Sequence, residues 1–285
     1  MTGEHQIEDH AGGTYGSSEA AAGWQRSGIA RAQLLTPLTE RLLDLAGVDI
    51  GHRVLDVAAG TGEQTLLAAQ RVGQNGAVLA TDIAANMLAL GAQAAAQAGL
   101  RNVETLARDA RDLNLDLESF DAAIMRLALM LVPERARVMA GIYRALKPGA
   151  KFASLVIGAA DKCPLIALPM GIAGRHAGAP HAPFGDPGLF ALGDPNTLAA
   201  TYKNAGFRDV TVEAAPVQRR YPSLVVAMQN VRDMLPEIPQ LLMNVSETER
   251  AAAWAEIEDA LREYDHGDGL VGPHTYLIGV GTKAP

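Results

Sequence analysis

The chain has 285 residues, with 24 Lys and Arg against 32 Asp and Glu, and a formal net charge of −8 at pH 7. This charge gives the surface no overall attraction for nucleic acid or for an anionic membrane. The single cysteine, Cys163, excludes an internal disulfide and a multi-cysteine metal site. No apolar run reaches the roughly 18 residues that span a bilayer, and the first residues carry no targeting signal. We expect a cytoplasmic monomer or homodimer that binds no metal, nucleic acid or membrane.

The first 49 residues divide into a polar tail and a helical segment. Residues 1–17 are polar and rich in Gly and His, which predicts a disordered tail. Residues 18–49 carry leucines at helical spacing, among them Leu35, Leu38 and Leu42. This segment is therefore predicted to be helical, with a break near Pro37.

The residues that follow predict a strand, a glycine turn and a helix. Residues 54–57 are a short apolar run, after which Gly60 and Gly62 can adopt backbone angles that other residues avoid. A dinucleotide fingerprint would need Gly or Ala at position 65, where this chain has Thr65. Glu63 would repel a pyrophosphate and suits a positively charged ligand without phosphate. The turn therefore predicts a site for a nucleoside such as S-adenosylmethionine.

Strand and helix patterns alternate five times between residues 52 and 157, which predicts a parallel sheet with helices on both faces. The second strand ends at Asp82, 20 residues after Gly62, which is about where a carboxylate reaches ribose hydroxyls in nucleotide-binding units. Asp82 is also a good N-cap for the helix that follows, and both roles can hold at once.

Over about residues 50–157 the chain resembles the class I S-adenosylmethionine-dependent methyltransferases, most closely the ubiquinone/menaquinone-biosynthesis C-methyltransferases. The resemblance rests on five motifs in order: residues 56–62, Asp82, residues 109–110, residues 120–121 and residues 146–149. It implies an α/β fold with a Rossmann-like seven-stranded sheet, mostly parallel with the last strand antiparallel. It also implies that residues 50–157 form the cofactor-binding core and that residues 18–49 are lid helices, although packing on the outside of the sheet is an equal alternative.

The resemblance also assigns cofactor contacts. The methionine end would lie against Asp56, Ala58, Gly60, Thr61 and Gly62; the ribose against Asp82; the adenine against Ile83, Met87, Asp109 and Ala110; and Arg126 would open onto the methionine and the substrate. Two of these have plain alternatives, since Met87 is as well suited to a core and residues 108–112 could be a solvated charged loop.

The sequence departs from the family pattern after residue 157. Residues 158–285 would complete the sheet and carry two cap insertions, at about 159–195 and 215–270. Long loops in a compact domain are usually functional or disordered, and the apolar residues of the first insertion favour a cap helix. Residues 196–204, 224–235 and 247–264 predict helices, and residues 207–213 and 274–281 predict strands. Candidate substrate contacts are Trp24, Met170, Ile172 and Phe184.

The chemistry that the resemblance implies is an in-line displacement of a methyl group from a sulfonium, for which positioning and exclusion of water matter most. A base would assist C- or O-methylation, and His176 and His181 are weak candidates. The segment Met125–Leu129 and the large cap make a quinone ring a doubtful acceptor and favour a small molecule of specialised metabolism. A non-methylating enzyme such as a cyclase, or a protein or RNA methyltransferase, remains an alternative.

Overall fold

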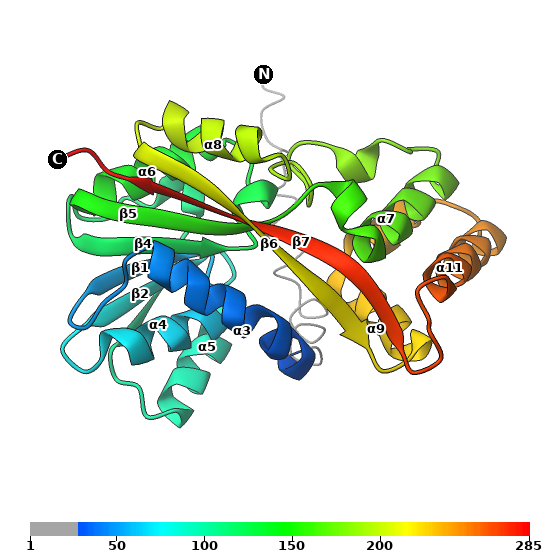
Figure 1. Ribbon diagram of the computed structural model, residues 1–285, viewed down its shortest axis with the longest axis horizontal. Helices are drawn as coiled ribbons and strands as arrows, with labels where there is room; N and C mark the ends of the chain where they lie inside the picture. Colours follow the sequence, from blue (N-terminus) through cyan, green and yellow to red (C-terminus); the bar gives the residue numbers. More distant parts are fainter. Residues whose placement is uncertain (1–27) are drawn as a thin grey trace, which may run out of the picture.

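The computed structural model describes residues 28–285, and it contains a single seven-stranded sheet in the order β3-β2-β1-β4-β5-β7-β6 (Figure 1). Strand β7 is antiparallel to both of its neighbours, and the other pairs are parallel. This arrangement confirms the predicted fold class. The strands are β1 Arg53–Val57, β2 Ala77–Asp82, β3 Val103–Ala107, β4 Phe120–Arg126, β5 Leu146–Ile157, β6 Arg208–Tyr221 and β7 Leu270–Thr282.

Two helical layers cover the sheet (Figure 1). Helix α4 contacts α3 and α5 on one side, while α6 and α8 contact each other on the opposite side. Strands β1 and β4 are buried on both faces, as expected for the centre of a parallel sheet. The helices are α3 Gly28–Leu45, α4 Glu63–Val72, α5 Ala85–Gln97, α6 Arg135–Ala145 and α8 Pro195–Asn204.

The sheet places a ligand crevice between β1 and β4. Along the chain the strands first run outward from β1 through β2 to β3, and then return to the other side of β1 with β4. At such a reversal of strand order, the loops after the carboxyl ends of the two strands diverge and leave a crevice. The residues that follow β1, β2 and β4 therefore meet at one edge of the sheet.

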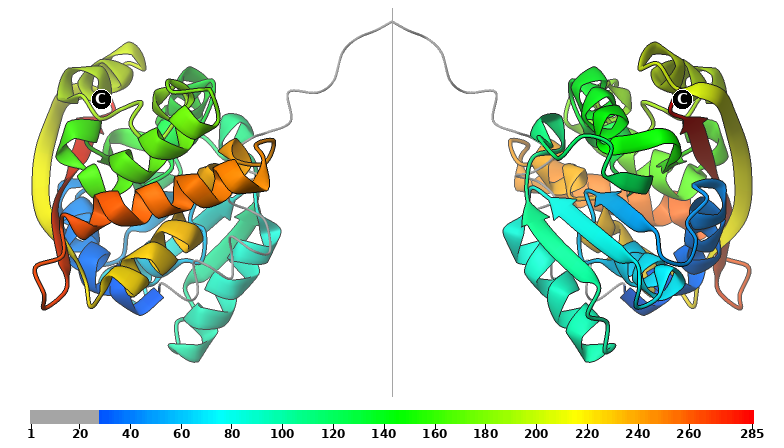
Figure 2. Two further views of the ribbon diagram at one scale, coloured as in Figure 1. Left: turned by 90° about the vertical axis from the view of Figure 1, so that its right-hand side faces the viewer. Right: turned by 90° about the vertical axis from the view of Figure 1, so that its left-hand side faces the viewer.

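The last two strands extend beyond the rest of the sheet and carry a cap (Figure 1). Strand β6 is longer than the predicted 207–213, and it accommodates Pro216 because it is the edge strand and can spare an amide donor. Between β6 and β7 lie three helices, α9 Leu224–Met234, α10 Glu237–Leu241 and α11 Glu247–Arg262. Helix α11 packs against α7, Pro164–His176, which comes from the first predicted cap segment (Figure 2).

Ionic contacts join α7 to α11. His176 Nδ1 lies 2.7 Å from Glu249 Oε1, and its Nε2 lies 2.7 Å from Glu256 Oε2. Arg175 also pairs with Glu256. The hydrogen bonds to Glu256 and Glu249 raise the pKa of His176 above its ordinary value of 6.5. His176 is therefore a contact between cap helices.

We expect His176→Gln to destabilise the protein in a pH-dependent way. Because the pKa of His176 is higher in the folded state, its contribution is complete below the ordinary pKa of 6.5 and is lost as pH rises through the raised value. The difference in Tm between wild type and variant should thus be largest near pH 6 and fade in alkaline solution. The exposed His181→Gln is the control. A difference that is the same at all pH values would contradict the ionic contact.

Candidate active site

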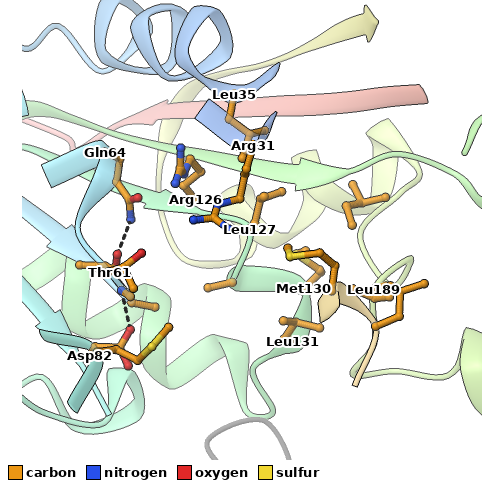
Figure 3. A pocket seen from close by; sticks show the side chains of 18 of the residues that line it. Arg31, Leu35, Thr61, Gln64, Asp82, Arg126, Leu127, Met130, Leu131 and Leu189 are labelled. Carbon is orange, nitrogen blue, oxygen red and sulfur yellow. Dashed lines mark hydrogen bonds between the residues drawn. The ribbon is translucent and has the colours of Figure 1, made fainter. Parts of the chain in front are cut away.

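One pocket of about 270 Å³ lies at the carboxyl edge of the sheet and reaches under the cap (Figure 3). Its first wall comes from the loops after β1, β2 and β3. Its opposite wall comes from β6, β7 and the cap helices α7 and α9. The residues of the first wall are Ala58, Ala59, Gly60, Thr61, Gln64, Asp82, Ile83, Ala84, Met87, Arg108, Asp109, Ala110 and Arg111.

The glycine turn presents backbone to this pocket. Gly60 lines the pocket at φ 57°, and its N–H donates to Asp82 Oδ2 at 2.8 Å. Gly62, at φ 81°, is not a lining residue: a Cβ there would lie 3.0 Å from the Cα of Gly91 in α5. The two glycines therefore have different structural roles. Gly60 opens the turn toward a ligand, whereas Gly62 permits close packing of the turn on α5.

We expect Gly60→Ala and Gly62→Ala to fail in different ways. Both variants place a side chain in the left-handed region, at a cost of about 1 kcal/mol or more. Gly62→Ala additionally forces backbone apart and should lower the Tm further. Gly60→Ala adds a methyl group beside the pocket and should weaken cofactor binding more than stability. Thermal unfolding and calorimetric titration separate the two effects, and equal losses of Tm would refute the distinction.

Asp82 joins the second strand to the turn. Its Oδ1 accepts from the Ala84 N–H at 2.8 Å, so the carboxylate holds the start of α5 as well as the Gly60 amide. Burial raises the pKa of Asp82 above its ordinary value, against these backbone hydrogen bonds. The N-cap of α5 is Ala84, so the prediction that Asp82 is the N-cap is wrong, and Asp82 instead holds the loop before the helix. Its carboxylate still borders the pocket.

The predicted adenine contacts come together in the same wall. Ile83 is 45% exposed and Met87 is 5% exposed, and both line the pocket. Asp109 also lines it and accepts hydrogen bonds from Arg111, which lower the pKa of Asp109 despite its partial burial. Ala110 lies beside it at the start of a 3₁₀ turn, Ala110–Asp112. The charged run 108–112 is therefore ordered at the pocket edge.

Asp56 is buried beneath the turn and is not a lining residue. Its carboxyl accepts from Thr65 Oγ1 at 2.5 Å and from Gln64 Nε2 at 3.3 Å, and burial raises its pKa to about 7. Thr65 stands where a dinucleotide fingerprint has Gly or Ala, and here it ties α4 to β1. Gln64 also donates to the Ala59 carbonyl at 3.2 Å. Asp56 therefore supports the glycine turn through Gln64 and Thr65, on the side away from the pocket.

Arg126 at the end of β4 lies in a buried ionic cluster. Its Nη2 is 2.8 Å from Glu63 Oε2, and its Nη1 is 3.1 Å from Thr39 Oγ1. Arg31 of α3 pairs with the same Glu63, and both arginines line the pocket (Figure 3). Burial alone would raise the pKa of Glu63, but Arg31 and Arg126 outweigh it and lower the pKa. Glu63 thus neutralises arginine, whereas the sequence suggested that it faces a cationic ligand.

Two non-glycine residues of the pocket have backbone angles that favour glycine. Ala58 follows β1 with φ 54°, and Leu127 follows β4 with φ 59°. Both line the pocket, and the Leu127 N–H donates to the Leu155 carbonyl at 2.8 Å. Strain of this kind persists where the surrounding structure imposes it, and it gathers at functional sites.

The cap wall is apolar, but its residues differ from those expected. Met170 and Ile172 are 2% and 3% exposed and do not line the pocket, because α7 is packed between β7 and helices α10 and α11. Phe184 is 41% exposed and stacks on Phe190 outside the pocket. Trp24, like the predicted tail, lies outside the described residues. The cap wall is instead formed by Leu165, Ile166, Leu189, Val231, Met234 and Leu235, with Met130 and Leu131 beside them.

Neither candidate base reaches the pocket. His176 is held by glutamates at the α7–α11 contact, and His181 is exposed. His274 is buried in β7, where desolvation and the positive charge of Arg219 lower its pKa to about 2. Over residues 28–285, no histidine lines the pocket and no cluster of three His, Cys, Asp or Glu could hold a metal ion.

None of the helices between residues 28 and 285 combines the length and the apolar character that a membrane span requires.

Comparison with known proteins identifies a methyltransferase domain. The family model of that name matches residues 54–149. The demethylmenaquinone methyltransferase of Listeria monocytogenes is 34% identical over 113 residues, which are 40% of this chain and 48% of that protein. The ubiquinone/menaquinone biosynthesis C-methyltransferase UbiE of Methylococcus capsulatus is 39% identical over 110 residues, 38% of this chain and 44% of that protein. The chain spans about half the length of the curated relatives it matches.

Among solved structures, phosphoethanolamine N-methyltransferase 2 of Haemonchus contortus, in complex with S-adenosyl-L-methionine, gives a TM-score of 0.60. It is 18% identical, and the match covers 99% of this chain and 61% of that one. At this identity the likeness shows the fold alone. The family model and the two curated relatives confirm the resemblance to the methyltransferases, and the solved structure agrees with it in fold.

Proposed function

We propose that this protein is an S-adenosylmethionine-dependent methyltransferase that methylates a small molecule held beneath the cap, by C- or O-methylation. The observation that carries the proposal is the continuity of the pocket. One cavity runs from the glycine turn at Gly60 and Asp82 to an apolar wall that includes Leu165 and Val231. A cofactor at the first end and an acceptor at the second would therefore share one continuous space.

The first wall fits the nucleoside of this cofactor. The Asp82 carboxylate can accept from ribose hydroxyls, and Ile83 and Met87 offer apolar surface for a base. Asp109 offers a carboxylate for an exocyclic amine. Gly60 keeps side-chain atoms out of the space beside the turn. These features come from three successive loops, which supports S-adenosylmethionine over a ligand that contacts the turn alone.

When bound, the cofactor supplies an electrophilic methyl group on a sulfonium. The protein's part is to align the acceptor and to keep water out, and correct alignment can supply roughly 7 to 11 kcal/mol. Residues 158–285 contribute to both tasks in this proposal: α7 and α9 close the pocket with Leu165, Ile166, Val231 and Leu235. The segments 159–195 and 215–270 are thus proposed as the substrate cap.

Incubation with methyl-labelled S-adenosylmethionine and a metabolite extract tests the function. We expect label in a low-mass product and none with Asp82→Ala. Label in RNA or protein would replace the small-molecule proposal with a macromolecular substrate. A small molecule that is transformed without gaining label would point to a non-methylating enzyme such as a cyclase.

A further inference from the structure

The cap end of the pocket contains an arginine that lacks a carboxylate partner within the described part of the chain. Arg219 lies on β6, is partly buried and lines the pocket. Its one hydrogen bond among residues 28–285 is long, 3.5 Å from Nη2 to Asn230 Oδ1. The ionisable neighbours that act on it are Tyr221, Tyr276 and Cys163, none of which is a carboxylate. A guanidinium has five N–H donors, so most of those on Arg219 are available.

The strand register gathers polar groups around this guanidinium. Arg219 and Tyr221 lie two residues apart on β6 and share a face of the sheet, with the guanidinium carbon 5.8 Å from the ring centroid. Tyr276 of β7 pairs with Ala215 on the same face and also lines the pocket. The Tyr221 hydroxyl donates to Asn230 Oδ1 at 2.8 Å. Asn230 of α9 therefore fixes Tyr221 beside Arg219.

An apolar wall stands next to this polar cluster. Arg219 of β6 pairs with Gly272 of β7 in the antiparallel ribbon that these two strands form. A Cβ at Gly272 would lie 2.7 Å from Leu165 Cγ. The missing side chain lets α7 place Leu165 against the ribbon and into the pocket. At the far end of the pocket the Arg219 guanidinium, with Tyr221, Tyr276 and Asn230 beside it, thus faces an apolar wall, and its neighbour in sequence, Arg220, adds a second positive charge to the lining. Away from bulk water, an opposite charge is attracted more strongly to such a group.

The other two arginines discussed in the pocket differ from Arg219. Arg31 and Arg126 share Glu63, the first residue of α4, and so they lie beside the glycine turn. Arg219 lies instead on the ribbon that carries the cap, across from α9. A ligand group that meets Arg219 therefore belongs to the molecule under the cap rather than to the nucleoside.

We propose that Arg219 binds a carboxylate of the acceptor, so that the acceptor is an apolar organic acid. A planar carboxylate matches the two parallel N–H groups of a guanidinium, and Tyr221 or Tyr276 can approach one of its oxygens. The carboxylate would anchor the molecule at the far end while its apolar body lies along Leu165 and Leu235. This inference deepens the proposed function, because the term acceptor rests on methyl transfer.

Direct binding tests the inference without reference to turnover. Calorimetric titration would compare octanoate with octanamide, and benzoate with benzamide, in the presence of S-adenosylhomocysteine. We expect at least one acid to bind ten or more times tighter than its amide to wild type, and this preference to vanish in Arg219→Gln. The matched control is Arg208→Gln, which removes an exposed arginine from the same strand and should keep the preference.

The affinity for S-adenosylhomocysteine shows whether Arg219 serves the acceptor end. It should stay within about threefold of wild type in Arg219→Gln, with a similar Tm. Equal affinity of acid and amide for wild type would overturn the inference, even if the enzyme methylates a neutral molecule. A loss of cofactor affinity in Arg219→Gln would also overturn it and place Arg219 in the cofactor site. Acid preference in a protein that transfers no methyl would instead overturn only the proposed function.

Discussion

Asp82→Ala should weaken S-adenosylmethionine binding more than tenfold. The variant removes the carboxylate proposed to bind the ribose, and it also frees the Gly60 N–H that Asp82 Oδ2 holds at 2.8 Å. Each hydrogen bond to a charged group contributes roughly 1.5 to 3 kcal/mol, and a factor of ten corresponds to about 1.4 kcal/mol. Calorimetric titration of the purified protein measures the loss.

The matched control for this prediction is Asp116→Ala, which removes an exposed carboxylate away from the pocket. Its affinity should equal that of wild type. Asp82→Asn should be intermediate, because one oxygen remains for the turn or for the ligand. If Asp82→Ala bound the cofactor normally while its Tm fell, Asp82 would serve only to hold the glycine turn and the loop before α5.

Glu63→Gln should lower the free energy of unfolding by about 3 kcal/mol, which is typical when one partner of a buried ion pair is removed. The variant takes away the one carboxylate within ion-pair distance of Arg126 in the described chain and leaves Arg31 and Arg126 close together. It also removes a negative charge from the first turn of α4, where the helix dipole favours it. Urea denaturation at neutral pH measures the change.

An exposed ion pair provides the comparison. Arg41 and Glu213 are 48% and 41% exposed, so Glu213→Ala should change the free energy of unfolding little.

The loss of unfolding free energy in Glu63→Gln should also depend on pH. Because the folded state lowers the pKa of Glu63, its contribution is present above the ordinary value of 4.5 and is lost as pH falls through the lowered value. An equal loss for both variants at pH 7 would show that the cluster is as solvated as the surface.

The sequence was sufficient for the sheet and for the turn because local chemistry determines both. Buried strands appear in the sequence as apolar runs. An apolar run followed by Gly60 and Gly62, with a second run that ends at Asp82, 20 residues after Gly62, has few structural alternatives. The carboxyl ends of parallel strands must meet, so residues from separate motifs gather in one wall. The roles of Asp56 and Gly62 were harder to foresee, since burial beneath a turn and contact with a ligand favour the same residue types.

The cap could be predicted only as a region. The apolar residues of the first insertion predicted a cap helix that includes Met170 and Ile172. The side of α7 that faces the pocket, however, depends on how α11 packs against it, which is a contact between distant segments. Arg31 and Arg219 had no local signal at all. Arg31 meets Glu63 across 32 positions, and Arg219 enters the pocket because β6 continues past Pro216 as an edge strand.

The pairing of Tyr221 with Leu270 means that the insertion between β6 and β7 leaves the sheet and returns to it at neighbouring points. A segment whose two ends meet can be lengthened, shortened or replaced without changing the distance that the flanking strands must span. The helices α9, α10 and α11 are therefore joined to the sheet at one place, and α10 and α11 make their other main contact with α7. An exchange of residues 222–269 that keeps the surface facing α7 should thus leave the seven-stranded sheet unchanged while it alters the cap wall of the pocket.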